Sequence, residues 1–209
     1  VILFSQYLSC RICNCQLTAA CCWDLSSVLG RSRQTLLKLE LGWNKLGDSG
    51  VPLLCEELKH PNCKLQKLRL SSCDLTGSCC EDLSSVLSTN QTLKWLWLGG
   101  NKLGDSGVRQ LCEGLMNPNC KLKKLWLSLC DFTGSCSEDL SSVLSTKQEW
   151  LWLDDNKLGD SGVRQLCEGL MNPNCKLQEP WLTKENFNEE TWQMLKAVEE
   201  KKPGVVLLH

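Results

Sequence analysis

Leu-Gly-Asp-Ser-Gly occupies positions 46–50, and the same five letters return at 103–107 and 158–162. A second segment, Glu-Asp-Leu-Ser-Ser-Val-Leu-Ser-Thr, starts at Glu81 and again at Glu138. Internal repetition at a regular spacing indicates stacked units of one design, each packed mainly against its neighbours.

Each unit contains the pattern L-x-x-L-x-L-x-x-N/C-x-L, and successive copies of its third apolar position are 29, 29, 28, 29, 26 and 29 residues apart. This period and pattern are typical of leucine-rich repeats, in which every unit adds one short strand and one helix. We therefore predict an α/β horseshoe solenoid with parallel strands on the concave side and helices on the convex side. It forms a single domain of about seven repeats: 1–35, 36–64, 65–92, 93–121, 122–147, 148–176 and 177–209, the last with a C-terminal cap.

Two unit types alternate along the chain. One carries Asn after the strand (Asn44, Asn101, Asn156) and the other carries Cys (Cys15, Cys73, Cys130). Apolar residues at i, i+3, i+4 and i+7 then predict a helix with one buried face. Helix starts are expected at aspartates in one type and threonines in the other, whose side chains would accept from first-turn amides: Asp48, Asp105, Asp160, Thr18, Thr76 and Thr133.

Three places depart from the regular pattern. The chain begins inside a repeat without a polar cap, so we expect a fragment that lacks upstream sequence. At the other end, the polar stretch 189–201 is expected to be a helical cap. The sixth unit is two residues short, which predicts a tightened or frayed entry into its strand.

The units containing LGDSGVRQLCEGL, HPNCKLQKLRL and CCEDLSSVLSTNQTL resemble ribonuclease-inhibitor-like leucine-rich repeats. Within that group the chain is most similar, over essentially its whole length, to the C-terminal repeats of NLR proteins of the NACHT, LRR and PYD domain-containing family. The resemblance implies a ligand-sensing or autoinhibitory module of a cytosolic, inflammasome-type innate immune sensor or regulator. It also implies contact with the NACHT domain of the parent protein. The family's ATP site lies in that domain, and the chain has no G-x-x-x-x-G-K-[ST] loop, so we expect no cofactor here.

Composition argues against binding to nucleic acid or membranes and favours a cytoplasmic location. The formal charge of −1 provides no general attraction to nucleic acid or an anionic membrane, and no apolar run approaches the length of a membrane span. Of the 16 cysteines, all except Cys10 and Cys13 recur at fixed phases of the repeat, as small buried residues do, which favours reduced thiols and a cytoplasmic location.

Neither catalysis nor metal binding has a good candidate in the sequence. Cys10 and Cys13 form half of a zinc motif without a second pair, and the two histidines, His60 and His209, are far apart. We therefore predict neither a metal site nor an enzyme.

The 9 tryptophans are the most informative residues. Strand side chains alternate between the two faces, so the residues flanking the central strand leucine point to the concave surface. Two such columns gather six tryptophans in the C-terminal half of the chain. Such residues pack against one another and are also enriched at binding hot spots. The predicted protein-binding residues are Arg69, Trp95, Trp97, Trp126, Trp150, Trp152, Asp154, Asp155 and Trp181.

Two other functions, ribonuclease inhibition and redox sensing, are alternatives to this one. A ribonuclease inhibitor also places tryptophans on concave strands, but a trap for basic nucleases is expected to be strongly acidic, whereas lysines and arginines balance the acids here. A redox sensor would use the adjacent cysteines at 21–22 and 79–80, and it requires thiols that react rapidly in the folded protein.

Overall fold

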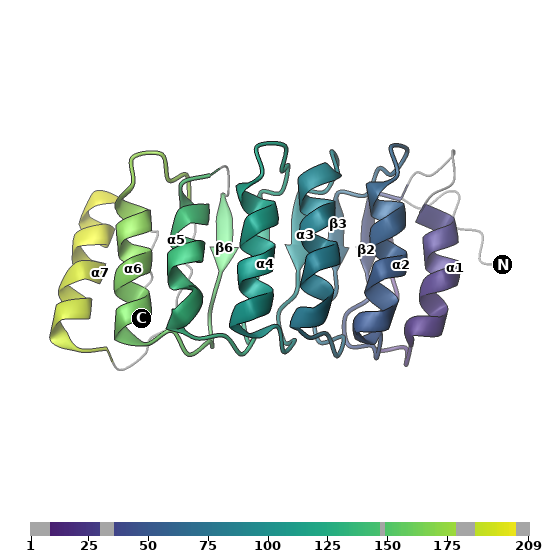
Figure 1. Ribbon diagram of the computed structural model, residues 1–209, viewed down its shortest axis with the longest axis horizontal. Helices are drawn as coiled ribbons and strands as arrows, with labels where there is room; N and C mark the ends of the chain where they lie inside the picture. The colour runs from purple at the N-terminus through teal and green to yellow at the C-terminus, as the bar shows by residue number, and fades with distance from the viewer. Residues whose placement is uncertain (1–8, 30–35, 147–148, 179–186, 204–209) are drawn as a thin grey trace.

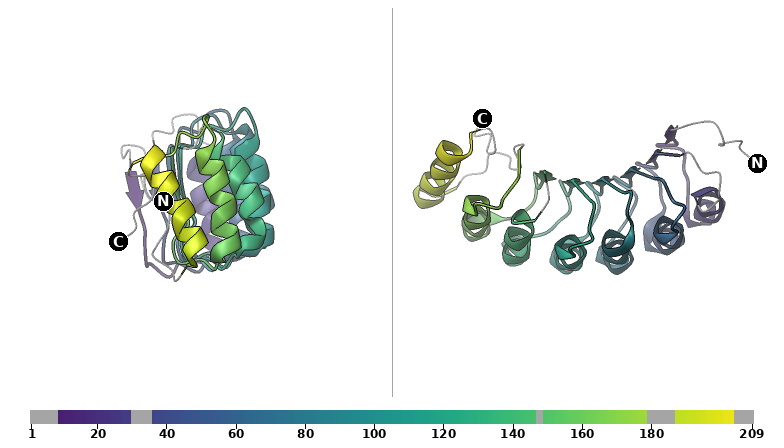
Figure 2. Two further views of the ribbon diagram at one scale, coloured as in Figure 1. Left: turned by 90° about the vertical axis from the view of Figure 1, so that its left-hand side faces the viewer. Right: turned by 90° about the horizontal axis from the view of Figure 1, so that it is seen from above.

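The computed structural model describes residues 9–29, 36–146, 149–178 and 187–203. Six parallel strands pair in chain order and form one open sheet, with each strand three residues long. The sheet lies along the inner side of a curved molecule (Figure 2). The strands are β1 (Ser9–Arg11), β2 (Lys38–Glu40), β3 (Lys67–Arg69), β4 (Trp95–Trp97), β5 (Lys124–Trp126) and β6 (Trp150–Trp152).

The described helices lie on the outer side of this sheet (Figure 2) and stand side by side in one layer (Figure 1). The predicted leucine-rich-repeat solenoid is confirmed. Within the described ranges no helix is both long and apolar enough to cross a membrane. The helices are α1 (Ala19–Leu29), α2 (Gly47–Lys59), α3 (Cys80–Thr89), α4 (Gly104–Met116), α5 (Ser137–Leu144), α6 (Gly159–Met171) and α7 (Glu189–Lys201), with 3₁₀ turns η1 (Gly77–Cys79) and η2 (Gly134–Cys136).

The core lies between the strand layer and the helix layer. The central residue of each strand from β2 to β6 is a leucine that pairs in register with the next, and all five are almost completely buried: Leu39, Leu68, Leu96, Leu125 and Leu151. Inward-facing leucines leave the first and third residues of each strand on the opposite, concave side.

The ladder asparagines hold consecutive units together, as the repeat pattern predicts. The buried amide of Asn101 accepts hydrogen bonds from the backbone N–H groups of Cys73 (2.9 Å) and Leu75 (3.1 Å), and donates to the carbonyl oxygens of Leu70 (2.8 Å) and Leu98. One side chain therefore satisfies four backbone groups at a tight bend of the chain. Asn44 and Asn156 make equivalent bonds.

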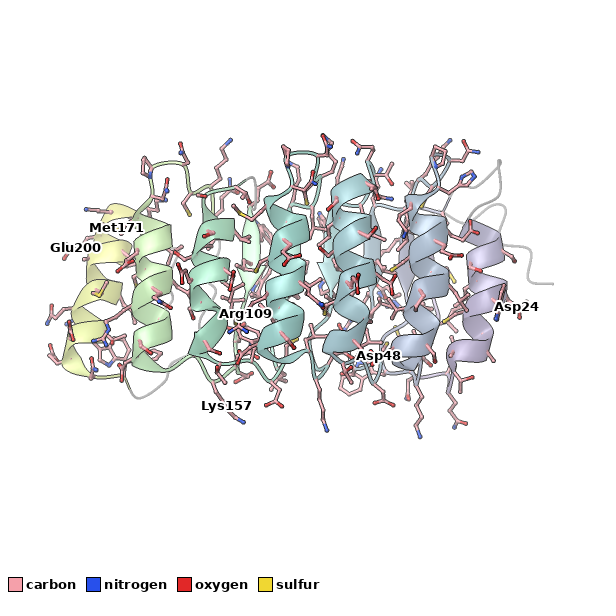
Figure 3. All side chains as sticks on the ribbon, viewed as in Figure 1. Asp24, Asp48, Arg109, Lys157, Met171 and Glu200 are labelled. Carbon is pink, nitrogen blue, oxygen red and sulfur yellow. The ribbon has the colours of Figure 1, made fainter. Side chains whose placement is uncertain are left out.

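The predicted role of the aspartates was wrong. The residue capping α2 is Leu46, and it makes no side-chain cap bond. Asp48 instead lies inside the first turn and accepts from the backbone N–H (2.8 Å) and hydroxyl (2.6 Å) of Thr76, in the next unit. Figure 3 shows Asp48 at the edge where the helices begin. Asp105 bonds Thr133 in the same way, whereas Thr76 and Thr133 do cap η1 and η2 as predicted.

The helices associate in pairs through glycines. A Cβ placed on Gly114 of α4 would lie 2.6 Å from the carbonyl oxygen of Ser84 in α3, and one placed on Gly107 would lie 2.7 Å from the Cα of Gly77. Gly169 and Gly162 of α6 meet α5 and η2 likewise. Backbone-to-backbone approach of this kind requires residues without a side chain.

The short sixth unit is accommodated after the end of a helix. α5 has 8 residues and stops at Leu144, whereas the equivalent α3 has 10 residues and continues to Thr89. Strand β6 still pairs in full register with β5. The segment EDLSSVLST is complete in both units, so the sixth unit is short in the stretch that follows Thr146, and the concave sheet continues unchanged.

The polar stretch near the C-terminus forms α7, with the expected bounds. Asn188 caps it by accepting from the backbone N–H of Thr191, and its buried residues are Thr191, Leu195 and Val198. One side therefore packs on α6, while the other side carries charged residues suited to solvent.

Candidate protein-binding face

Two rows of side chains extend across the concave face. Strand pairing aligns the first residues of the strands in one row and the third residues in another, as the alternation of strand side chains requires. The predicted columns lie side by side from β1 to β6, and Trp181 lies outside the described residues. The first row is Ser9, Lys38, Lys67, Trp95, Lys124 and Trp150; the second row is Arg11, Glu40, Arg69, Trp97, Trp126 and Trp152.

The second row contains a continuous stack of three indoles. The ring centroids of Trp97 and Trp126 are 4.2 Å apart with planes 13° from parallel, and those of Trp126 and Trp152 are 4.2 Å apart at 6°. Both faces of Trp126 are therefore covered by neighbours. All three residues remain partly exposed, so the stack presents ring edges to the concave side.

The first row alternates lysines with tryptophans. The ammonium of Lys67 lies 3.5 Å from the ring centroid of Trp95, and that of Lys124 lies 4.6 Å from Trp95 and 2.7 Å from Trp150. These are cation–π geometries. Lys67 and Lys124 were not among the predicted site residues, although the alternating Lys and Trp letters at equivalent strand positions were the signal that could have identified them.

The two rows contact each other through edge-to-face pairs of tryptophan rings. Trp95 meets Trp97 with ring centroids 5.6 Å apart at 63°, and Trp150 meets Trp152 at 5.2 Å and 70°. Five tryptophans from three strands thus form one contiguous aromatic surface. Aromatic pairs in these orientations stabilise by about 0.5–1.5 kcal/mol each, so the surface is rigid as well as apolar.

Arg69 lies beside the aromatic surface as an unneutralised cation. Its side chain forms no ion pair or hydrogen bond within the described part of the chain, and its Nε is buried without a partner. Its neighbour Glu40 pairs instead with Arg11 and Lys38. Burial would raise the pKa of the Glu40 carboxyl, but the hydrogen bonds from Lys38 and Arg11 outweigh burial and lower it, so Glu40 stays ionised and engaged.

The two predicted aspartates lie just after β6, at the opposite end of the aromatic surface. Asp154 is half-buried and accepts a long hydrogen bond (3.4 Å) from the Ser128 hydroxyl. Burial raises the pKa of the Asp154 carboxyl, and neighbouring Asp155 adds to the effect. Asp155 itself is exposed in the turn, with a left-handed φ of 56°.

The cysteines are free thiols, and most of them are buried. Burial raises the pKa of Cys22 to about 11. The pKa of Cys79 is raised by its side-chain hydrogen bond with the Cys80 thiol and by burial. A raised pKa keeps a thiol protonated and poorly nucleophilic at neutral pH. The ladder positions Cys73 and Cys130 are buried as expected, but Cys15, in the first unit, is exposed.

Three tryptophans stand apart from the concave rows. Trp23 on α1 and Trp43 in the turn after β2 are 68% and 62% exposed, and Trp192 packs edge to face on Phe187 near the C-terminal cap. Trp23 takes the place of Glu81 and Glu138 in the later units, so it is a solvent-facing residue of the helix layer.

Comparison with known proteins agrees with this architecture. A family profile described as Leucine Rich repeat matches residues 33–55, 62–84 and 89–112. The chain is 49% identical over 197 residues to human NACHT, LRR and PYD domains-containing protein 3, covering 93% of this chain and 19% of that protein. It is 53% identical over 167 residues to the mouse protein of the same name, covering 79% of this chain and 16% of that protein. It is 48% identical over 191 residues to mouse NACHT, LRR and PYD domains-containing protein 12, covering 90% of this chain and 18% of that protein.

The chain spans about a fifth of the length of these relatives. Its similarity to them extends over most of its own residues and coincides with the repeating strand and helix units. The chain is therefore built of leucine-rich repeats of the kind found in NACHT, LRR and PYD domains-containing proteins.

Proposed function

We propose that this chain is a non-catalytic, protein-binding module of a cytoplasmic NLR protein of innate immunity, organised in the seven units predicted above. Its concave face binds a partner protein through Trp95, Trp97, Trp126, Trp150 and Trp152. Any ATP-dependent step belongs to a NACHT domain of the parent protein, which this module would contact as a sensing or autoinhibitory element.

The observation that carries the proposal is the contiguous, partly exposed surface of five indoles. An aromatic patch rimmed by charges is more often an interaction site than an inert surface, and tryptophan is the residue type most enriched at binding hot spots. Rigid side chains also lose little conformational entropy when a partner binds. The competing interpretation is that the tryptophans serve only to stabilise the sheet.

A photocrosslinking experiment tests the proposal. A photoreactive phenylalanine analogue is placed at position 126, or at position 23 as a matched control on the helix layer, and the parent protein is crosslinked in cells. A protein captured from position 126 but not from position 23 is then bound in vitro to the chain.

Replacing Trp97 or Trp126 with Ala should weaken this binding by about 30-fold or more, the effect of losing a hot-spot residue worth about 2 kcal/mol, whereas Trp23→Ala should leave it unchanged. Thermal unfolding of each variant separates the two interpretations. Lower stability with unchanged affinity would show that the tryptophans are structural.

A further inference from the structure

The concave face carries opposite charge at its two ends. Four cationic residues accompany only one carboxylate, Glu40, at the outward positions of β1 to β3: Arg11, Lys38, Lys67 and Arg69. Beyond β6 the outward residue is Asp154, followed by the exposed Asp155. The aromatic surface lies between these ends.

The cationic end has unused binding capacity. Glu40 is already engaged by two cations, so it leaves Arg69 without a counter-ion. The side chain of Arg69 lies over Gly42, where an added Cβ would come 3.4 Å from its Nε. A guanidinium offers five donors in a planar fork that suits a carboxylate. An acidic side chain arriving here would pair with the half-buried guanidinium and supply the counter-ion that it lacks.

At the acidic end, the Asp154 carboxylate has no cationic partner within the described part of the chain. This carboxylate accepts a long hydrogen bond (3.4 Å) from the Ser128 hydroxyl. The nearby cation Lys124 is held between the rings of Trp95 and Trp150. Partial burial of the carboxylate raises its pKa, and a cation from a partner would reverse that cost.

From this arrangement we infer that the partner presents a protein segment with an acidic residue and a basic residue flanking an apolar stretch. The acidic residue lies on Arg69, the apolar side chains lie on the tryptophan edges, and the basic residue lies on Asp154. Three strand spacings of about 4.8 Å and a two-residue step of about 6.6 Å along the strand separate Arg69 from Asp154, so the charges of the segment lie about 16 Å apart, or about five residues in an extended chain. A polyanion fits poorly, because it would place negative charge against Asp154.

The inference rests on the proposed protein-binding role of the same face. Its probe is a phage library of random peptides of about twelve residues, selected on the folded chain at physiological ionic strength and counter-selected on Trp126→Leu, which retains apolar bulk. We expect the recovered peptides to carry one acid and one base on either side of apolar residues. Selection without this charge order would overturn the inference.

Charge reversal then assigns each end. Arg69→Glu should weaken binding of a recovered peptide about tenfold, and changing the acid of the peptide to lysine should restore binding to that variant only. Asp154→Lys should behave in the same way toward the basic residue. The matched controls are Lys196→Glu on α7 and Asp24→Lys on α1, both on the helix layer, where Figure 3 shows Asp24; they should have no effect.

The outcomes separate the two proposals. Peptides that depend on Trp126 but bind Arg69→Glu and Lys196→Glu equally would leave the binding face in place and overturn the charge order. Failure to enrich any peptide over the Trp126→Leu variant would overturn both. Binding of a single-stranded oligonucleotide that is lost in Arg69→Glu would assign the cationic end to nucleic acid and overturn the partner chemistry.

Discussion

A single amide, Asn101, satisfies four buried backbone groups, whereas the thiol of its counterpart in the other unit type, Cys73, forms weak hydrogen bonds to the carbonyl oxygens of Leu41 (3.3 Å) and Ser71 (3.5 Å). The two residues occupy equivalent ladder positions, but their energetic roles differ. In one type the side chain supplies the hydrogen bonds of the bend, and in the other it mainly fills space.

We therefore expect Asn101→Ala to lower the free energy of unfolding by at least about 3 kcal/mol, because several buried donors and acceptors lose their partner. Cys73→Ala, the matched ladder control, should cost about 1 kcal/mol. Urea unfolding of both variants checks the difference. Equal destabilisation would mean that water replaces the amide at the bend.

The two concave rows could be predicted from the sequence because the period of two along a strand depends only on the backbone. The packing of the rings could not. Whether Trp97 stacks on Trp126 or meets it edge-on depends on side-chain torsions chosen by several neighbours together. The partnerless state of Arg69 was equally hidden, because it follows from Glu40 bonding two other cations.

At the scale of helices and strands, two kinds of contact alternate along the solenoid. Inside a helix pair, as between α3 and α4, backbones touch at Gly77, Gly107 and Gly114. Between pairs, as from α4 to η2, Asp105 accepts from Thr133 and from the Ser135 hydroxyl. The first kind is close apolar packing, and the second is a set of exposed, charge-assisted hydrogen bonds.

Gly114→Ala should destabilise the protein by about 1–3 kcal/mol, since the new methyl group meets the Ser84 backbone and forces α3 and α4 apart. In an isolated helix the same change would stabilise by about 1 kcal/mol, so the sign of the effect identifies the contact. Thermal unfolding measures it, with exposed Glu113→Ala as the control. A stabilised variant would contradict the close approach.

The Asp105 junction should respond to pH. Burial would raise the pKa of the Asp105 carboxyl, but hydrogen bonds from Ser135 and Thr133 lower it below the ordinary value. A lowered pKa in the folded state adds stability above the unfolded pKa, and this stability is lost as pH falls through the folded pKa.

Asp105→Ala should accordingly cost about 1 kcal/mol at pH 7, and this difference from the wild type should shrink below about pH 4. Melting temperatures measured across that range check the prediction. Asp139→Ala, which removes only an exposed pair with Arg109, is the control. A difference that does not change with pH would exclude the charge as its source.

The aspartates show why element-level contacts escaped prediction. A carboxylate in the first turn of a helix is equally compatible with capping that turn and with bonding a neighbouring unit, and the true partner of Asp48 lies 28 residues away. In contrast, α7 was predicted with its bounds, because Asn188 and the spacing of its apolar residues are local signals. For the short sixth unit, the missing residues after Thr146 were visible in the sequence, but the earlier end of α5 was not.

On the scale of the whole molecule, the cysteines behave as part of the core. Of the 16 free thiols, 13 are buried; the remaining ones are Cys13, Cys15 and Cys21. Because burial raises the pKa of most of the buried group, they are expected to be unreactive in the folded state.

Labelling with a thiol reagent at neutral pH, followed by mass spectrometry, should modify Cys13, Cys15 and Cys21 within minutes and the others only at the rate of unfolding. The experiment also tests the redox alternative. Rapid modification of Cys79 or Cys80 in the folded protein would show that the adjacent pair is reactive, and it would reopen that function.

The pairing of helices through glycine has a mechanical consequence. A solenoid stretched from its ends bears load across every junction in series, and the exposed Asp–Thr junctions have fewer groups to resist separation than the interlocked pairs. Under tension the molecule should therefore lengthen in steps, each of which corresponds to the unfolding of one pair of repeats. Single-molecule stretching would record this as extension jumps twice the size expected for one repeat, whereas uniform single-repeat jumps would mean that all junctions are equally strong.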